Sequence, residues 1–262
     1  MPKNSAITNQ REQEILREIR MAGGSCRIGY LARQLKVSDE TIRRNIKSLE
    51  GSDLVEKVHG GVSLAGLVSV VEQPFQLRMD RNAEAKKTMA IEVAAMIENG
   101  DSLFLDIGST MAHVAQALQN HTDLYIVTNS IAVAHLLTAR NNNRVFLAGG
   151  ELRSRDGGAF GKDALKFIKR FNLQYAITSV AAINASSGFM LHDIEEADIS
   201  GEAIKRAQVS IVVADSSKFG RRTPITMQSP QDFDILVTDA QPDEGICDML
   251  ESQEISISIS SP

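Results

Sequence analysis

The sequence predicts an α/β protein in which an N-terminal winged helix-turn-helix precedes a mainly parallel α/β domain. Within residues 1–64, three short amphipathic helix patterns are followed by two short strand patterns. From residue 102 onward, short apolar runs alternate with helical patterns, which is the order that βαβ units produce. The chain has 262 residues, 43% of them hydrophobic, which is enough for two cores. We therefore expect a DNA-binding domain at 1–64, a connector at 65–81 and a second domain at 82–262.

The N-terminal elements follow from the spacing of apolar residues. Residues 11–22 form the first predicted helix, which ends at two glycines, and residues 28–35 form the second. A tight turn at 36–38 leads into the third helix, so the second and third helices form a helix-turn-helix. Residues 54–58 and 62–64 are predicted to be the two strands of a wing, in which glycines let the backbone approach phosphate closely.

The third predicted helix, residues 38–49, is the most informative segment. Ser38 is expected to cap its N-terminus, and apolar residues at positions 42, 46 and 49 share one buried face. A helix of this kind can enter the DNA major groove, although the helix taken alone is more simply a solvated basic face. The side chains left on its other sides are Thr41, Arg43, Arg44 and Lys47.

The charges are unevenly distributed along the chain. Residues 1–64 hold 11 basic and 8 acidic residues, whereas the remainder holds 17 basic and 25 acidic residues. The net charge of −5 does not indicate nucleic acid, but a mildly basic head on an acidic body fits a small DNA-reading module.

Several classes of protein are not indicated. No apolar run approaches the ~18 residues of a membrane span, and the polar N-terminus does not read as a signal peptide. Cys26 and Cys247 make no metal-ligand spacing. We therefore expect a reduced, cytoplasmic protein that contacts no membrane and carries no metal or cofactor.

The predicted second domain carries polar residues where its strands end. Its strands are predicted at 102–105, 124–127, 145–148, 175–180, 209–214 and 235–238, with helices at 82–98, 111–118, 131–138 and 164–171. The segment 106–110, DIGST, lies directly before a helix, whose free N–H groups and dipole favour an anion, most simply a phosphate. An ordinary turn capped by Ser or Thr is the alternative. The glycine pattern is not one that binds nucleotides.

Other strand ends add to this predicted site. Asn129 and Ser130 follow the second strand, and glycines 149 and 150 follow the third. After the fifth strand, Lys218 is a candidate for balancing a phosphate, while Asp106 and Asp215 are candidates for binding sugar hydroxyls or fixing the lysine. Helix capping is the alternative for each aspartate. Together these residues predict a small polar ligand at the carboxyl ends of the strands.

The N-terminal pattern resembles the DeoR family of bacterial transcriptional regulators. The similarity lies in Val37-Ser38, residues 41–44 (TIRR), Leu49-Glu50 and residues 59–61 (HGG). The resemblance implies that Thr41 and one arginine read base edges, that Ser38 and Lys47 bind phosphate, and that the wing turn lies near DNA. The DNA-binding residues that the resemblance implies are Ser38, Thr41, Arg43, Arg44, Lys47, His59 and Gly60. His59 either touches the DNA backbone or packs the turn. The family usually has Asp-Leu after the paired arginines, where this chain has Asn45-Ile46.

The C-terminal segments 106–110, 128–130, 147–150 and 215–220 resemble the DeoR-type sensor domain, and the match covers nearly the whole chain. The resemblance implies a fold related to ribose-5-phosphate isomerases and a phosphorylated sugar or polyol as inducer. Residues 147–158, LAGGELRSRDGG, are most similar to the glycerol-3-phosphate regulon repressor branch. The implied effector-binding residues are Asp106, Gly108, Ser109, Thr110, Asn129, Ser130, Gly149, Gly150, Glu196, Asp215 and Lys218.

Two departures from the family bear on function. Ser200-Gly201 replaces a basic pair that usually follows Glu196, and residues 181–184 lack the carboxylates that the isomerases carry there. We expect an oligomeric repressor, a dimer or tetramer, that binds operator DNA and is released by a phosphorylated sugar or polyol. One alternative is an isomerase-like enzyme with a DNA-binding appendage, using Glu196 or Asp193 as its base. Another is a DNA-binding protein whose body serves only for assembly.

Overall fold

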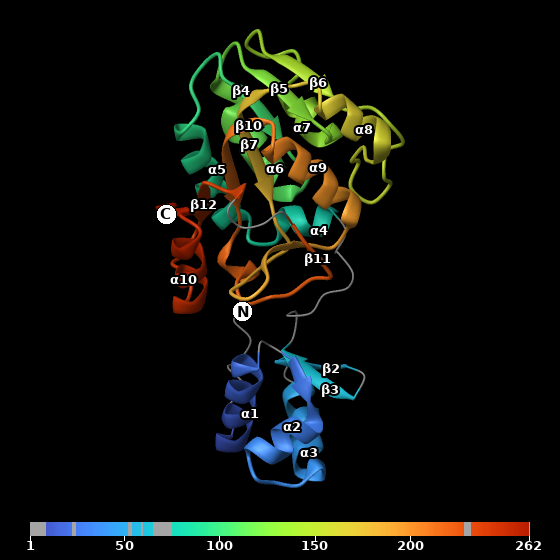
Figure 1. The fold of residues 1–262 in the computed structure, drawn as a ribbon, viewed down its shortest axis with the longest axis vertical. Helices are drawn as coiled ribbons and strands as arrows, with labels where there is room; N and C mark the ends of the chain where they lie inside the picture. The colour runs from blue at the N-terminus through green and yellow to red at the C-terminus, as the bar shows by residue number, and fades with distance from the viewer. Residues whose placement is uncertain are drawn as a thin grey trace. The chain divides into compact units, whose positions relative to one another are not determined.

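The computed structural model describes residues 9–22, 25–51, 54–58, 60–64, 75–227 and 232–261 (Figure 1). The chain forms two compact units that divide after residue 70. Among the described residues, no helix combines the length and the apolar character that crossing a bilayer requires.

The N-terminal unit is a winged helix-turn-helix, as predicted. Its elements are α1 (Gln10–Met21), β1 (Ser25–Arg27), α2 (Ile28–Gln34), α3 (Asp39–Gly51), β2 (Val55–Val58) and β3 (Gly61–Leu64). The strands form an antiparallel sheet in the order β1-β3-β2. Residues 25–27, which the sequence predicted to be an extended link, thus form a third strand. Three residues are too few to show the alternation that identifies a strand.

One apolar core holds this unit together. Ile42, Ile46 and Leu49 of α3 are buried, as their spacing predicted, and they pack with Ile15 of α1 and Leu31 of α2. The helix predicted at 11–22 ends at Met21. The two glycines that follow Ala22 lie outside the described residues.

A capping box starts α1. The Asn9 side chain accepts a hydrogen bond from the Glu12 backbone N–H at 2.9 Å, and the Glu12 carboxylate accepts one from the Asn9 N–H at 2.8 Å. Two of the helix's otherwise unpaired donors are satisfied in this way.

The C-terminal unit is built on a seven-stranded, wholly parallel sheet in the order β13-β12-β10-β7-β4-β5-β6. The strands are β4 (Ser102–Leu105), β5 (Tyr125–Thr128), β6 (Arg144–Leu147), β7 (Leu173–Ser179), β10 (Ala207–Val213), β12 (Ile235–Thr238) and β13 (Ser256–Ile259). Six of them match the predicted strands to within two residues at each end. The fold class is therefore confirmed for both units.

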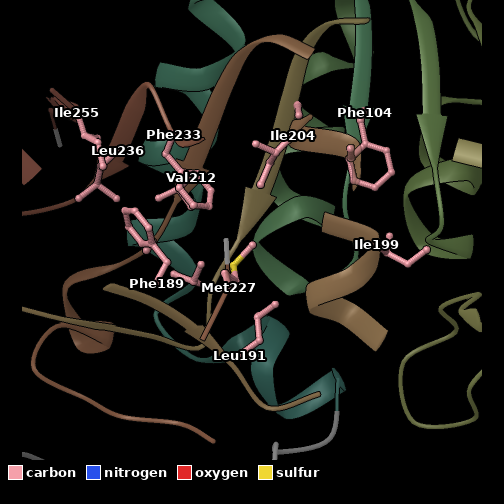
Figure 2. Close-up of a cluster of buried hydrophobic side chains, with 14 of the residues drawn as sticks. Phe104, Phe189, Leu191, Ile199, Ile204, Val212, Met227, Phe233, Leu236 and Ile255 are labelled. Atoms are coloured by element: carbon pink, nitrogen blue, oxygen red, sulfur yellow. The ribbon is translucent and has the colours of Figure 1, made fainter. Parts of the chain in front are cut away.

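Helices cover both faces of this sheet. The first face packs against α5 (Ala83–Ala95), α6 (Ser109–Ala117) and α7 (Ile131–Leu137), and the second against α8 (Gly161–Ile168), α9 (Ile194–Ile204) and α10 (Glu244–Ser252). Leu103 and Leu105 face the first core and Phe104 the second, as the two-residue period of a strand requires. Figure 2 shows the second core, where Phe104 lies among the side chains around Ile199 and Ile204 of α9.

Several features were absent from the sequence prediction or differ from it, among them the strand β13 and the helices α9 and α10. A small antiparallel sheet joins β8 (Ala182–Asn184), β9 (Gly188–Leu191) and β11 (Ile225–Thr226). The short helix α4 (Phe75–Asp80) lies within the range assigned to the connector. The helix predicted at 82–98 begins at Ala83 and ends at Ala95, and its N-cap residue Asn82 has a left-handed backbone with no side-chain cap.

Candidate functional site

The predicted DNA-reading surface is the exposed side of α3. Ser38 precedes this helix, and its Oγ accepts a hydrogen bond from the Thr41 backbone N–H at 3.2 Å and lies 2.9 Å from Thr41 Oγ1. Ser38 therefore caps α3, as expected, while remaining exposed. Arg43, Arg44 and Lys47 are all exposed.

The basic side chains of α3, Arg43, Arg44 and Lys47, are exposed and make no ion pair with another described residue. At Asn45, where the resemblance implies an aspartate, the side-chain amide donates to the Thr41 carbonyl at 2.8 Å. The departure at Asn45 thus leaves both guanidinium groups available to an external partner such as DNA phosphates or base edges.

The wing turn is only partly described. Gly60 lies between β2 and β3, is exposed, and has a φ of +74°, a conformation that favours glycine. His59 lies outside the described residues, so its predicted role at the wing remains a prediction.

The C-terminal unit contains one topological switch point in its described sheet. From β4 the chain moves to β5 and β6 on one side, whereas β7, β10, β12 and β13 follow on the other side. The carboxyl ends of β4 and β7 therefore flank the point where the direction reverses. Open parallel sheets bind ligands at such a crevice, and the predicted segment 106–110 lies there.

The start of α6 is an anion-binding feature without a side-chain cap. Gly108 occupies the N-cap position with a φ of +126°, and no side chain caps the helix. The alternative of a Ser or Thr cap is therefore not what the structure shows at this end. Ser109 and Thr110 begin the helix and are buried. The first-turn N–H groups of α6, at the positive end of the helix dipole, are of the kind that bind anions.

Asp106 lies in front of this helix and is buried. Its carboxylate accepts hydrogen bonds from the Ile107 backbone N–H at 2.7 Å and from the Ser200 hydroxyl of α9. Burial raises the pKa of this carboxyl from 3.8 to about 6, although both hydrogen bonds and the charge of Arg153 act in the opposite direction. Ser200, which replaces a basic residue of the family pattern, is thus a direct partner of the predicted site.

Asn129 is the most unusual polar residue at this edge. It follows β5, whose Thr128 is in register with Leu105 of β4, so Asn129 and Asp106 occupy equivalent positions on neighbouring strands. The Asn129 side chain is 0% exposed, and neither its nitrogen nor its oxygen has a hydrogen-bond partner among the described residues. A buried unpaired amide costs ~1–3 kcal/mol. Ser130, beside it, accepts from the Val133 N–H at 3.4 Å and caps α7.

A buried lysine completes the site, and the sequence analysis missed it. Lys86 of α5 is 4% exposed, and its ammonium donates to Ser109 Oγ at 3.0 Å. The available signal was its position, because Lys86 lies three and seven residues before the buried Met89 and Val93 and so belongs to the apolar face of α5. A charged residue in such a stripe is rarely buried without a function.

Asp215 lies on the other side of the switch point, after β10. It accepts from the Ser217 N–H at 3.1 Å, as a cap, and from the Asn82 amide at 2.8 Å. Its burial tends to raise the pKa of this carboxyl, but hydrogen bonds from Ser217 and Asn82 and the charge of Lys218 outweigh burial and lower it. Lys218 therefore lies near Asp215, as it must if Asp215 is to fix the position of this lysine.

The remaining predicted residues lie further from the switch point. Gly149 and Gly150 follow β6 at the edge of the sheet and are exposed. Glu196, in the first turn of α9, forms an ion pair with Arg153. Arg153 also donates to Asp156 at 2.6 Å and to Asp193 at 3.0 Å, which places four charged side chains in one cluster.

Together the two units have the architecture of a ligand-responsive transcriptional regulator: a winged helix-turn-helix and an α/β domain built on a parallel sheet. Residues 11–66 match the DeoR-like helix-turn-helix domain, and residues 81–240 match the DeoR C terminal sensor domain. The chain belongs to the DeoR family of transcriptional regulators.

Several curated relatives align over most of the chain. The glycerol-3-phosphate regulon repressor of Escherichia coli is 37% identical over 87% of this chain and 90% of its own length. The protein of that name from Haemophilus influenzae is 35% identical over 94% and 95%. The HTH-type transcriptional repressor CsqR of Escherichia coli is 36% identical over 89% of each chain. These relatives are transcriptional repressors, and the chain is accordingly a DNA-binding regulator and not an enzyme.

Solved structures resemble the chain more remotely. Ribose-5-phosphate isomerase A from Methanocaldococcus jannaschii is 14% identical, with a TM-score of 0.39 over 53% of this chain and 55% of its own. The sorbitol operon regulator SorC from Klebsiella pneumoniae is 12% identical, with a TM-score of 0.37 over 80% and 91%. Both likenesses concern the fold alone.

Proposed function

We propose that this protein is a cytoplasmic repressor of a sugar or polyol catabolic operon, and that a phosphorylated sugar or polyol lowers its affinity for operator DNA. The observation that carries the proposal is the buried amide of Asn129, which has no partner among the described residues and follows β5, next to the strand β4 that leads into the uncapped start of α6. Two of the aligned relatives are named repressors of a glycerol-3-phosphate regulon, which supports a small phosphorylated polyol.

The proposed ligand pose follows from the chemistry of the residues. The phosphate lies at the start of α6, near the Ser109 and Thr110 N–H groups, with the Lys86 ammonium supplying positive charge. The ligand's hydroxyls pair with Asn129 and Asp106, whose amide and carboxylate provide both donors and acceptors.

The proposed DNA contacts divide between specificity and affinity. Thr41 and one of the two arginines, Arg43 or Arg44, read base edges in the major groove, while Ser38 and Lys47 bind phosphates. A single short recognition helix reads few base pairs, so a dimer or tetramer that places two or more heads on one operator is part of the proposal.

The isomerase alternative is not favoured. The two carboxylates that could replace the missing catalytic ones, Asp193 and Glu196, both pair with Arg153 and are held by it. Residues 181–184 contain no carboxylate. Enolisation needs a carboxylate base that is free to take a proton from carbon.

The test is DNA binding measured by fluorescence anisotropy on the promoter region of the chain's own gene. The panel holds glycerol 3-phosphate and several sugar phosphates, each beside its unphosphorylated counterpart. We expect at least one phosphorylated compound to weaken DNA binding by ~5–150-fold, the range of typical allosteric coupling, and its counterpart to have no effect. If no phosphorylated compound alters DNA binding, the proposed effector class is wrong.

A further inference from the structure

The ammonium group of Lys86 joins two separate parts of the C-terminal unit. One of its hydrogen bonds goes to Ser109 Oγ at the start of α6, at 3.0 Å. The other two go to backbone carbonyls beside the end of α4, those of Arg78 and Arg81, the latter at 2.9 Å. An ammonium has three N–H donors, so each is used once.

The position of α4 in the chain gives this bridge its significance. Helix α4, Phe75–Asp80, is the first described element after β3, and it leads directly into α5 through Arg81 and Asn82. The segment whose carbonyls accept from Lys86 is therefore near the start of the C-terminal unit. The chain connects this start covalently to the DNA-reading head. A change in the hydrogen bonds to the Arg78 and Arg81 carbonyls therefore acts near the start of the C-terminal unit.

The charge of Lys86 is incompletely balanced. The pKa of its ammonium is lowered to about 8: burial is the largest cause, Asp215 acts against it, and Lys218, Arg78 and Arg81 act in the same direction as burial. All three hydrogen-bond acceptors of Lys86 are uncharged oxygens. A dianionic phosphate at the start of α6 is a much stronger acceptor than a peptide carbonyl.

We propose that Lys86 is the relay between the effector and the DNA-reading head: a bound phosphate takes N–H donors from the Arg78 and Arg81 carbonyls and thereby loosens the end of α4. This inference rests on the proposed function, because it assumes that a phosphate binds beside Ser109. It adds the route by which binding is transmitted. Lys86 acts here as a positioning residue for α4 in addition to a ligand for phosphate.

The first test uses the unaltered protein and follows amide hydrogen exchange in the peptide that covers residues 75–82. We expect the panel compound that binds the protein to speed exchange in this peptide while slowing it around residues 106–112. Inorganic phosphate serves as a second probe. Unchanged exchange at 75–82, with the ligand bound, overturns the relay and leaves the proposed function intact.

The second test compares Lys86→Met with Lys87→Met. Lys87 is the adjacent residue of α5, is exposed and pairs with Glu84 at 2.7 Å, so its variant removes the same charge outside the site. Calorimetry gives the ligand affinity of each variant, and anisotropy gives the DNA affinity with and without saturating ligand. We expect Lys86→Met to bind ligand at least ~10-fold more weakly. Because it lacks the hydrogen bonds to the Arg78 and Arg81 carbonyls, it should bind DNA weakly even without ligand and show no further loss when saturated, while Lys87→Met responds like the unaltered protein.

The outcomes separate the two ideas. If Lys86→Met binds DNA as tightly as the unaltered protein without ligand and releases it when saturated, Lys86 serves binding only, which refutes the relay. A protein that binds none of the phosphorylated compounds refutes the proposed function itself. If Lys86→Met fails to fold, the exchange experiment on the unaltered protein still decides the question.

Discussion

Replacing Asp106 by asparagine should stabilise the protein at neutral pH. The replacement keeps the shape of the side chain and removes the charge. The asparagine oxygen can accept from the Ile107 N–H, and its nitrogen can donate to Ser200 Oγ. The Ser200 hydroxyl then donates to the Glu196 carbonyl, from which it already lies 2.9 Å away. The variant therefore satisfies the same hydrogen bonds without burying a carboxylate.

The expected gain follows from the pKa of this carboxyl. A pKa raised from 3.8 to about 6 means that the folded state binds the proton more tightly than the unfolded state. The stability that this proton contributes is complete below pH 3.8 and is lost as pH rises through about 6. At one pKa unit per ~1.4 kcal/mol, the ionised form costs ~3 kcal/mol of folding free energy at neutral pH.

Urea unfolding followed by circular dichroism gives the test. The advantage of Asp106→Asn over the unaltered protein should grow from ~1.5 kcal/mol near pH ~5 to ~3 kcal/mol near pH ~7.5. Asp198→Asn, which removes a charge from the exposed side of α9, should change stability by less than ~0.5 kcal/mol at either pH. An advantage for Asp106→Asn that is independent of pH would refute the assignment of the raised pKa to burial.

Three further predictions concern the two proposed sites. Of Arg43→Ala and Arg44→Ala, at least one should cost ~1–3 kcal/mol of DNA binding and relax base preference, whereas Lys47→Ala should weaken binding on all sequences; equal, sequence-blind losses in anisotropy would exclude direct readout by the arginines. Gly108→Ala should lower stability by ~1–3 kcal/mol because its φ of +126° disfavours a side chain, and an unchanged melting temperature would contradict this. Asn129→Leu should raise the stability of the ligand-free protein by up to ~1–3 kcal/mol and abolish the effector response, because it removes a buried, unpaired amide. Retention of that response would show that Asn129 does not bind the effector.

Much of the fold was predictable because its elements are strongly periodic. The buried stripe of α3, the capping by Ser38 and six strands of the parallel sheet are local properties of the sequence. The small antiparallel sheet was not predictable, because its strands are two to four residues long and β11 pairs with β9 across a long stretch of chain.

The candidate site was predictable where strand order alone brings residues together. Residues 106–110 and Asn129 follow neighbouring parallel strands, so their proximity required only the topology. The contribution of Lys86 required the packing of α5 on α6, since its 23-residue separation from Ser109 carries no pattern. Similarly, the pairing of Glu196 with Arg153 depends on how the loop before α8 folds onto α9, and a sequence shows only that both are charged.

The two faces of the sheet contribute unequal parts of the proposed ligand site. The phosphate end is made from backbone N–H groups and Lys86, on the α5–α6 face, and these recognise a group that all sugar phosphates share. The other face contributes Ser200, with Arg153 and Glu196 beside it, through side chains that α9 and one loop carry. A new effector can therefore arise in evolution by exchanging a few side chains on the α9 face. The phosphate-binding groups, which in the proposed mechanism link the metabolite to the DNA-reading head, stay unaltered. The specificity of the regulator can therefore diverge while its switching mechanism is inherited.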